Sequence, residues 1–136
     1  MQPLFESGDL LERITAEELP AQFNSTDNRN DSLDSRSDDR GPEPEGVTVG
    51  EVRGRFYAFV ALERIGGIVV FDVTRPAAPH FVEYVNTRDF SGATPEGSDA
   101  APEGLAFVPG CHSPSGKALL AVAFEVSGTT RMFEFD

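Results

Sequence analysis

Four glutamates stand at similar points of two similar stretches of the sequence. Glu45 and Glu103 each lie in the phrase Pro-Glu-Gly, directly ahead of an apolar run, while Glu63 and Glu125 each follow an apolar run. Carboxylate oxygens are the hard ligands that calcium takes. These residue types predict a calcium or other divalent-metal site, on the condition that the fold brings the four side chains to one place.

Residues 24–46 could add further oxygens to that site. The segment is rich in Asn, Asp, Ser and Gly and nearly free of apolar side chains, a composition typical of a loop or of disorder. Asp34, Asp38 and Asp39 lie among serines there, although their spacing does not fit an EF-hand loop. The alternative interpretation is a solvated acidic loop whose arginines form local salt bridges.

The glutamates also have a purely structural interpretation. Glu45 and Glu103 could cap backbone groups where strands begin, with the glycines needed for a bend, while Glu63 and Glu125 occupy exposed hairpin corners. If all four instead lie together, each carboxylate raises the pKa of its neighbours. A bound cation, or an arginine such as Arg64, would relieve that repulsion.

The charge balance narrows the choice of partner. The 136 residues carry 23 acidic and 11 basic side chains, for a net charge of −12. Such a surface repels nucleic acid and favours divalent cations.

The single cysteine, Cys111, excludes an internal disulfide. We expect no membrane span, because no segment approaches the ~20 apolar residues that a spanning helix needs, and the first ten residues lack the features of a signal peptide.

The hydrophobic pattern predicts the elements that must position these side chains. Apolar residues between Leu10 and Leu19 recur at near-helical spacing, Ser7 or Asp9 can cap the first turn, and Pro20 marks the end of the helix. After the acidic loop the period becomes two, in β-branched and aromatic runs. These runs predict strands at 47–52, 55–63, 67–73, 80–85, 105–110, 118–125 and 130–136.

Two of these stretches resemble each other. Residues 57–73 align with 119–135 without a gap, so that Glu63 meets Glu125. An antiparallel meander of four strands that recurs at this scale is typical of a propeller blade. The predicted fold class is therefore all-β: antiparallel four-stranded meanders forming about two blades of a β-propeller, with a short N-terminal helix.

The propeller interpretation predicts how the chain is divided into parts and where the four glutamates lie. Because the first two strands of a blade are antiparallel, all four glutamates would gather near one mouth of the propeller channel. The partners would be the remaining blades of a longer parent propeller, and the isolated chain would be marginally stable or would pair with itself. The predicted parts are a preceding strand end and short helix at 1–23, the acidic loop at 24–46, a blade at 47–85, a polar loop at 86–101, and a second, incomplete blade at 102–136.

Several spaced motifs carry a family resemblance: "ESGDLLERITAEELPAQFNS", "DSRSDDRGPEPEGV", "YAFVALERIGGIVVFDVTRPAAP", "NTRDFS", "APEGLAF" and "EVSGTT". Together they resemble the choice-of-anchor I proteins, large secreted bacterial propeller proteins related to mesenchyme-specific cell-surface glycoproteins, some of them labelled alkaline-phosphatase-like. The resemblance covers nearly the whole chain and corresponds to the C-terminal portion of the propeller. It implies an extracellular, periplasmic or cell-surface setting and, for the animal relatives, a role around calcium mineral.

Three functions follow from these observations. The first is a calcium-associated propeller fragment that acts in surface or matrix interactions. The second is a metal-dependent phosphatase- or phytase-like esterase, in which metal ions bind phosphate and activate water; its phosphate-binding cations would be Arg36, Arg40, Arg64 and Arg88. The third is a purely structural propeller without metal.

Overall fold

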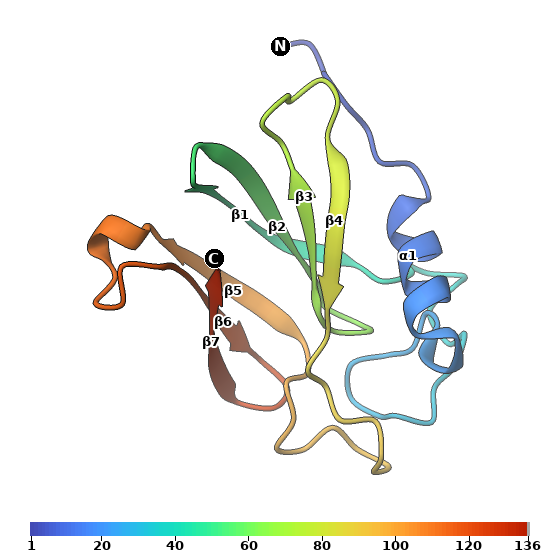
Figure 1. The fold of residues 1–136 in the computed structure, drawn as a ribbon. Coiled ribbons are helices and arrows are strands. Elements are labelled where there is room, and N and C mark those ends of the chain that lie inside the picture. Colours follow the sequence, from blue (N-terminus) through green and yellow to red (C-terminus); the bar gives the residue numbers. More distant parts are fainter. Residues whose placement is uncertain (136) are drawn as a thin grey trace.

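Two antiparallel sheets lie face to face in the computed structural model, which describes residues 1–135 (Figure 1). The first sheet has the order β1-β2-β3-β4 and the second the order β5-β6-β7. The first sheet consists of β1 (Pro44–Val52), β2 (Arg55–Leu62), β3 (Ile68–Asp72) and β4 (His80–Val85), and the second of β5 (Pro102–Val108), β6 (Ala118–Phe124) and β7 (Thr129–Phe135). This confirms a mostly β protein built from two antiparallel meanders, whereas the closed propeller stays a prediction.

All seven predicted strands are present, and the largest difference lies at two strand starts. β1 and β5 begin at Pro44 and Pro102, three residues before their predicted starts. Both Pro-Glu-Gly phrases are therefore the first residues of strands. Each strand carries a register irregularity at its Pro-Glu-Gly phrase, so the glycines do mark a local departure from regular pairing.

The predicted helix is α1 (Leu10–Glu18), followed by the short 3₁₀ helix η1 (Pro20–Gln22); a second one, η2 (Gly110–His112), lies between β5 and β6. Asp9 is at the N-cap position, but its side chain makes no capping hydrogen bond. The strand end expected within residues 1–23, at residues 3–5, is not formed. Within residues 1–135, no helix has the length and apolar character needed to cross a membrane.

The main core lies between the two sheets, because strand residues alternate between two faces. Phe59 of β2 is fully buried there. Its ring lies 5.7 Å from the ring of Phe107 and 4.9 Å from that of Phe135, centroid to centroid. The buried residues around it are Ala61, Ile68 and Val70 of the first sheet and Leu120, Val122 and Phe124 of the second.

A second core lies on the other face of the first sheet. Leu11 and Ile14 of α1 pack there against Leu62, Val69 and Phe71. The helix thus forms because its apolar stripe has a sheet to cover, which is how most short helices are stabilised. In Figure 1 α1 lies beside the first sheet, on the side away from the second.

Residues that are 62 positions apart in the sequence occupy equivalent positions in the two sheets. Gly66 and Gly128 are one such pair, and their backbones form equivalent hydrogen bonds. Gly66 and Gly128 both have positive φ, 88° and 65°. Each N–H donates to a carbonyl four residues earlier, those of Leu62 and Phe124, at 3.0 Å in both cases. Gly66 and Gly128 therefore close the β2–β3 and β6–β7 hairpins with the same turn, in a backbone region that suits glycine.

Opposite faces of the two sheets meet in the main core. Val60 and Phe71 face α1 in the first sheet. The residues 62 positions later, Val122 and Phe133, face the first sheet instead. The sheets therefore stack the same way round, one behind the other, and are not related by a two-fold axis, which would bring equal faces together.

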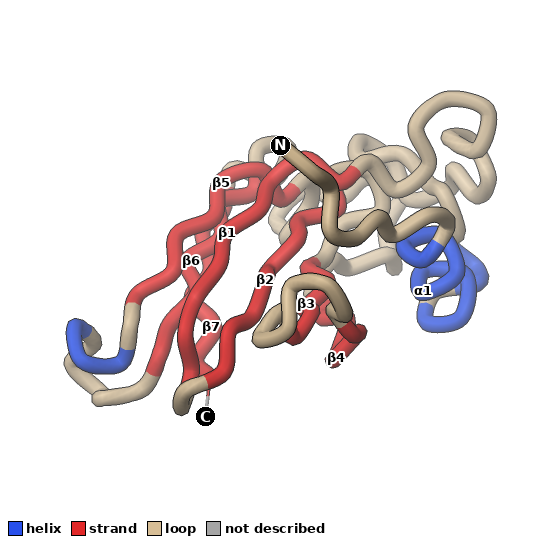
Figure 2. Tube along the Cα trace, turned by 90° about the horizontal axis from the view of Figure 1, so that it is seen from above, coloured by secondary structure: helices blue, strands red, loops and turns tan. Residues whose placement is uncertain are grey.

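β1 and β5 run side by side in the same direction along this stack (Figure 2). Gly46 lies against the backbone of Glu103, and Gly50, four residues on, lies against the ring of Phe107. A Cβ atom at position 46 would lie 2.5 Å from the Glu103 carbonyl oxygen. Glycine is thus required at this position because the backbones of two sheets approach each other there.

Gly46→Ala should destabilise the protein by about 1–3 kcal/mol, the usual cost of overpacking, because the new methyl group meets a backbone oxygen that cannot rotate away. The matched control is Gly104→Ala in the second Pro-Glu-Gly phrase, where the nearest atom to an added Cβ is the Ala123 Cβ at 3.3 Å. Urea unfolding followed by circular dichroism measures both. Equal losses for the two variants would contradict the proposed role of close strand approach.

Candidate functional site

The four glutamates lie at one end of the stacked sheets. In the first sheet Pro44 pairs with Leu62, which places Glu45 and Glu63 at the same end. In the second sheet Pro102 pairs with Phe124, which does the same for Glu103 and Glu125. Since Gly46 lies against the Glu103 backbone, the two acidic ends adjoin. We call this region the glutamate end.

Glu63 is the one buried member of the glutamate end. Its residue surface is only 7% exposed. Burial, followed by a hydrogen bond with Glu45, raises the pKa of Glu63 to about 7, while the charge of Arg64 opposes the shift. The Arg64 Nη1 atom lies 3.0 Å from a Glu63 carboxylate oxygen. The raised pKa favours the protonated form of Glu63 near neutral pH, and this form avoids repulsion from the neighbouring carboxylate.

Glu103 and Glu125 lie on the exposed side of the glutamate end. Together with Gly104 and Ala123 they line a shallow groove at the end of β5 and β6. Across residues 1–135, no three His, Cys, Asp or Glu side chains lie close enough together to hold a metal ion. The structure therefore brings the predicted strand ends together without gathering the glutamates into a coordination cluster, and the metal site stays a prediction.

The loop carboxylates have local partners. Asp34 accepts a hydrogen bond from the Ser37 hydroxyl. Asp39 lies 2.6 Å from Arg36 Nη2 and 3.8 Å from Arg40 Nε, and Asp38 is exposed. These contacts agree with the alternative in which the arginines of the acidic loop form local salt bridges.

Arg64 links the acidic loop to the glutamate end. Its Nε atom lies 2.6 Å from a Glu43 oxygen, and its Nη1 atom is bonded to Asp27. Burial opposes ionisation of Glu43, but hydrogen bonds from Arg40 and Arg64 outweigh it and lower the Glu43 pKa. Sequence reasoning missed Glu43 and Asp27, because their link to Arg64 spans 21 and 37 residues.

Arg88, in the polar loop at 86–101, forms hydrogen bonds with the acidic loop at 24–46. The residue is 6% exposed, and burial lowers its pKa to about 10, which leaves it charged at neutral pH. Its guanidinium donates two hydrogen bonds to Asn30 Oδ1, at 3.2 and 2.9 Å. It also donates to the backbone carbonyls of Thr26, Arg29 and Arg64, at 2.9–3.0 Å. The acidic loop is therefore ordered and partly buried, not solvated throughout.

The chain is similar to known proteins over nearly all of its length. The model of the family described as "Choice-of-anchor I domain" matches residues 1–76. Gigasin-3a of Magallana gigas is 30% identical over 98% of this chain and 51% of its own length. The mesenchyme-specific cell surface glycoprotein of Strongylocentrotus purpuratus is 34% identical over 51% of this chain and 10% of its own length.

No solved structure matches the chain. The chain thus spans about half the length of one curated relative and a tenth of the other.

The raised pKa of Glu63 should make the protein more stable in mild acid. A carboxyl whose folded-state pKa is about 7, above its usual 4.5, favours folding when protonated, so its contribution is complete below pH 4.5 and is lost as pH rises through 7. Glu63→Gln should remove this dependence and stabilise the protein at pH 8 by on the order of 2 kcal/mol.

Unfolding free energies between pH 5 and pH 8 check that sign. Glu125→Gln, at the corresponding but exposed position, is the control and should leave the pH dependence unchanged. A wild-type protein that gains stability relative to Glu63→Gln as pH rises would show the assigned sign to be wrong.

Arg88→Met should destabilise the protein by about 3 kcal/mol, because it leaves several buried acceptors without a donor. Amide hydrogen exchange should accelerate first in residues 24–34, which Arg88 holds in place. Arg13→Met is the control, because its ion pair with Asp9 is exposed and should be worth less than about 0.5 kcal/mol. Unchanged exchange in that loop would refute the anchoring role.

Proposed function

Because the chain belongs to the choice-of-anchor I family, we propose that its two sheets are consecutive blades of a β-propeller in a longer protein that acts through surface or matrix contacts. The family, together with a relative named as a cell surface glycoprotein, indicates a surface-associated protein. The relatives extend well beyond the matched part, which leaves room for further blades.

One observation carries the propeller proposal: the two sheets stack the same way round. The outer face of each sheet therefore corresponds in position to the face of the other sheet that is buried in the main core. Such stacking is open-ended and closes only as a ring of several units. The outer faces are also apolar. Val47 and Val49 on one side are 67% and 55% exposed, and Met132 on the other is 53% exposed. Further blades would cover these residues.

Calcium is proposed at the glutamate end. Protonation of Glu63 would reduce its repulsion with Glu45, and a bound divalent cation would do the same. Glu103 and Glu125 adjoin them at the ends of β5 and β6. Asp34, Asp38 and Asp39 belong to the proposal as sources of further oxygens, and the net charge of −12 would attract the ion. Bound calcium would displace the Glu63 proton, so binding should weaken as pH falls below 7.

The esterase alternative gains no support from the arginines it would use to bind phosphate. Arg88 is buried among backbone carbonyls, Arg64 is engaged by Asp27 and Glu43, and Arg36 and Arg40 pair with loop carboxylates. A phosphate group would have to compete with these internal acceptors.

Calcium at millimolar concentration should raise the melting temperature of the protein, and a chelator should reverse the rise, because the ion binds the folded state alone. The double variant Glu45→Gln/Glu103→Gln should lose the shift. Glu17→Gln, on the exposed side of α1, should retain it. A melting-temperature shift that persists in the double variant would show that calcium binds elsewhere on the protein. If the wild-type protein shows no shift, the structural propeller without metal is favoured.

The same samples separate the binding protein from the esterase. Incubation with p-nitrophenyl phosphate should give no turnover with or without calcium if the chain acts through contacts. Turnover that the chelator abolishes would overturn the proposal in favour of the metal-dependent esterase.

A further inference from the structure

A groove of about 420 Å³ opens on the α1 face of the first sheet. Its lining is mostly apolar and also includes Glu6 and Ser7. The apolar lining residues used below are Phe5 and Leu11 from the N-terminal segment and α1, Ala58 and Val60 of β2, Phe71 of β3, and Val73. We call it the Phe5 groove. We propose that it receives an aromatic side chain from the second strand of a neighbouring sheet; this inference rests on the propeller proposed above and names the contact between its blades.

The main core supplies the template for this contact. The residues 62 positions after Ala58, Val60, Phe71 and Val73 are Leu120, Val122, Phe133 and Phe135. These four residues belong to the same core cluster as Phe59 of the second strand of the first sheet, and the ring of Phe135 lies 4.9 Å from that of Phe59. The Phe5 groove thus stands where the second sheet holds Phe59, and the aromatic ring is the part that it lacks.

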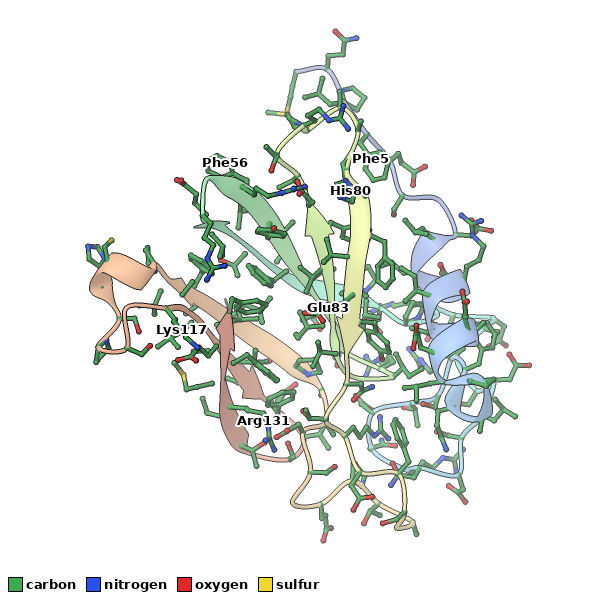
Figure 3. The ribbon with its side chains drawn as sticks, in the orientation of Figure 1. Phe5, Phe56, His80, Glu83, Lys117 and Arg131 are labelled. Carbon is green, nitrogen blue, oxygen red and sulfur yellow. The ribbon has the colours of Figure 1, made fainter. Side chains whose placement is uncertain are left out.

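The rim of the groove supports the same assignment. Val47 and Val49 on β1 are exposed, whereas the residues 58 positions later, Leu105 and Phe107, pack against Phe59 and its neighbours. Helix α1 covers the sheet at Leu62 and Val69 and leaves the side of β1 exposed. Figure 3 shows Phe5 beside the end of the first sheet that carries His80, and Pro79 next to His80 lines the groove.

A second copy of this chain does not supply the missing ring. Tyr57, Phe59 and Ala61 correspond to Leu119, Ala121 and Ala123, which lie on the outer face of the second sheet. A copy that stacked in the same way would therefore present the methyl group of Ala121 to the Phe5 groove and leave most of it empty. The occupant we assign is a different sheet of the longer protein, one that carries an aromatic residue at the Phe59 position.

The fit between the Phe5 groove and an aromatic ring can be tested in this chain by placing a phenyl ring on the outer face of the second sheet. Ala121→Phe should convert the chain into one that stacks on itself, because the new ring of one copy fits the Phe5 groove of the next. Burial of one phenyl side chain corresponds to at least about a tenfold tighter association. Sedimentation equilibrium should therefore show Ala121→Phe associating at a concentration at least about tenfold lower than wild type.

Two controls make the test specific to the groove. Ala123→Phe adds the same apolar surface to the same face two residues away and should behave as wild type does. Adding Ala58→Phe to Ala121→Phe fills the groove from within and should abolish the extra association. Val73→Phe, in the opposite wall, serves the same purpose if Ala58→Phe does not fold.

Each result bears on one proposal only. Equal association of Ala121→Phe and Ala123→Phe, or association that persists when the groove is filled, would overturn the assignment of the Phe5 groove. Those outcomes would leave the calcium-dependent melting shift unaffected, whereas loss of that shift alone would reject the metal proposal and not the groove.

Discussion

The contact around Phe59 is the interaction on which the rest of the structure depends. This ring lies between the two sheets and packs with apolar residues of both. A sheet that is apolar on one face must bury that face against another layer. The requirement for close packing explains why glycine occurs where β1 passes β5, since any side chain at position 46 would hold the two backbones apart.

The direction of stacking has a further consequence. Because corresponding residues face the same way in both sheets, the interface is heterologous: one face meets a different face. Each sheet therefore has one outer face that corresponds in position to the buried face of the other sheet. The first sheet covers part of its spare face with α1, and the second sheet carries small residues such as Ala121 and Ala123 on its own. In the proposed propeller, further sheets of a longer chain would cover these two faces.

Two arginines hold the acidic loop against the first sheet. Arg64 and Arg88 lie in loops that adjoin the first sheet, and their side chains bind carboxylates and backbone carbonyls of the segment that precedes β1. Buried cations of this kind remain charged only where acceptors surround them. Their arrangement leaves the carboxyl groups of Glu63 and Glu45 next to each other, and the repulsion between these two groups when both are ionised is the physical basis of the calcium proposal.

Sequence alone determined the elements of this protein, because their signals are local. Alternating apolar residues predicted all seven strands to within three residues, and helical spacing between Leu10 and Leu19 predicted α1. The alignment of 57–73 with 119–135 placed Glu63 and Glu125 at corresponding points. Only the tertiary structure decided which faces meet, that Gly46 is needed for close approach, and that Arg88 binds the acidic loop across 58 residues of chain. Those outcomes depend on side chains that are distant in sequence and become neighbours only when the sheets have packed.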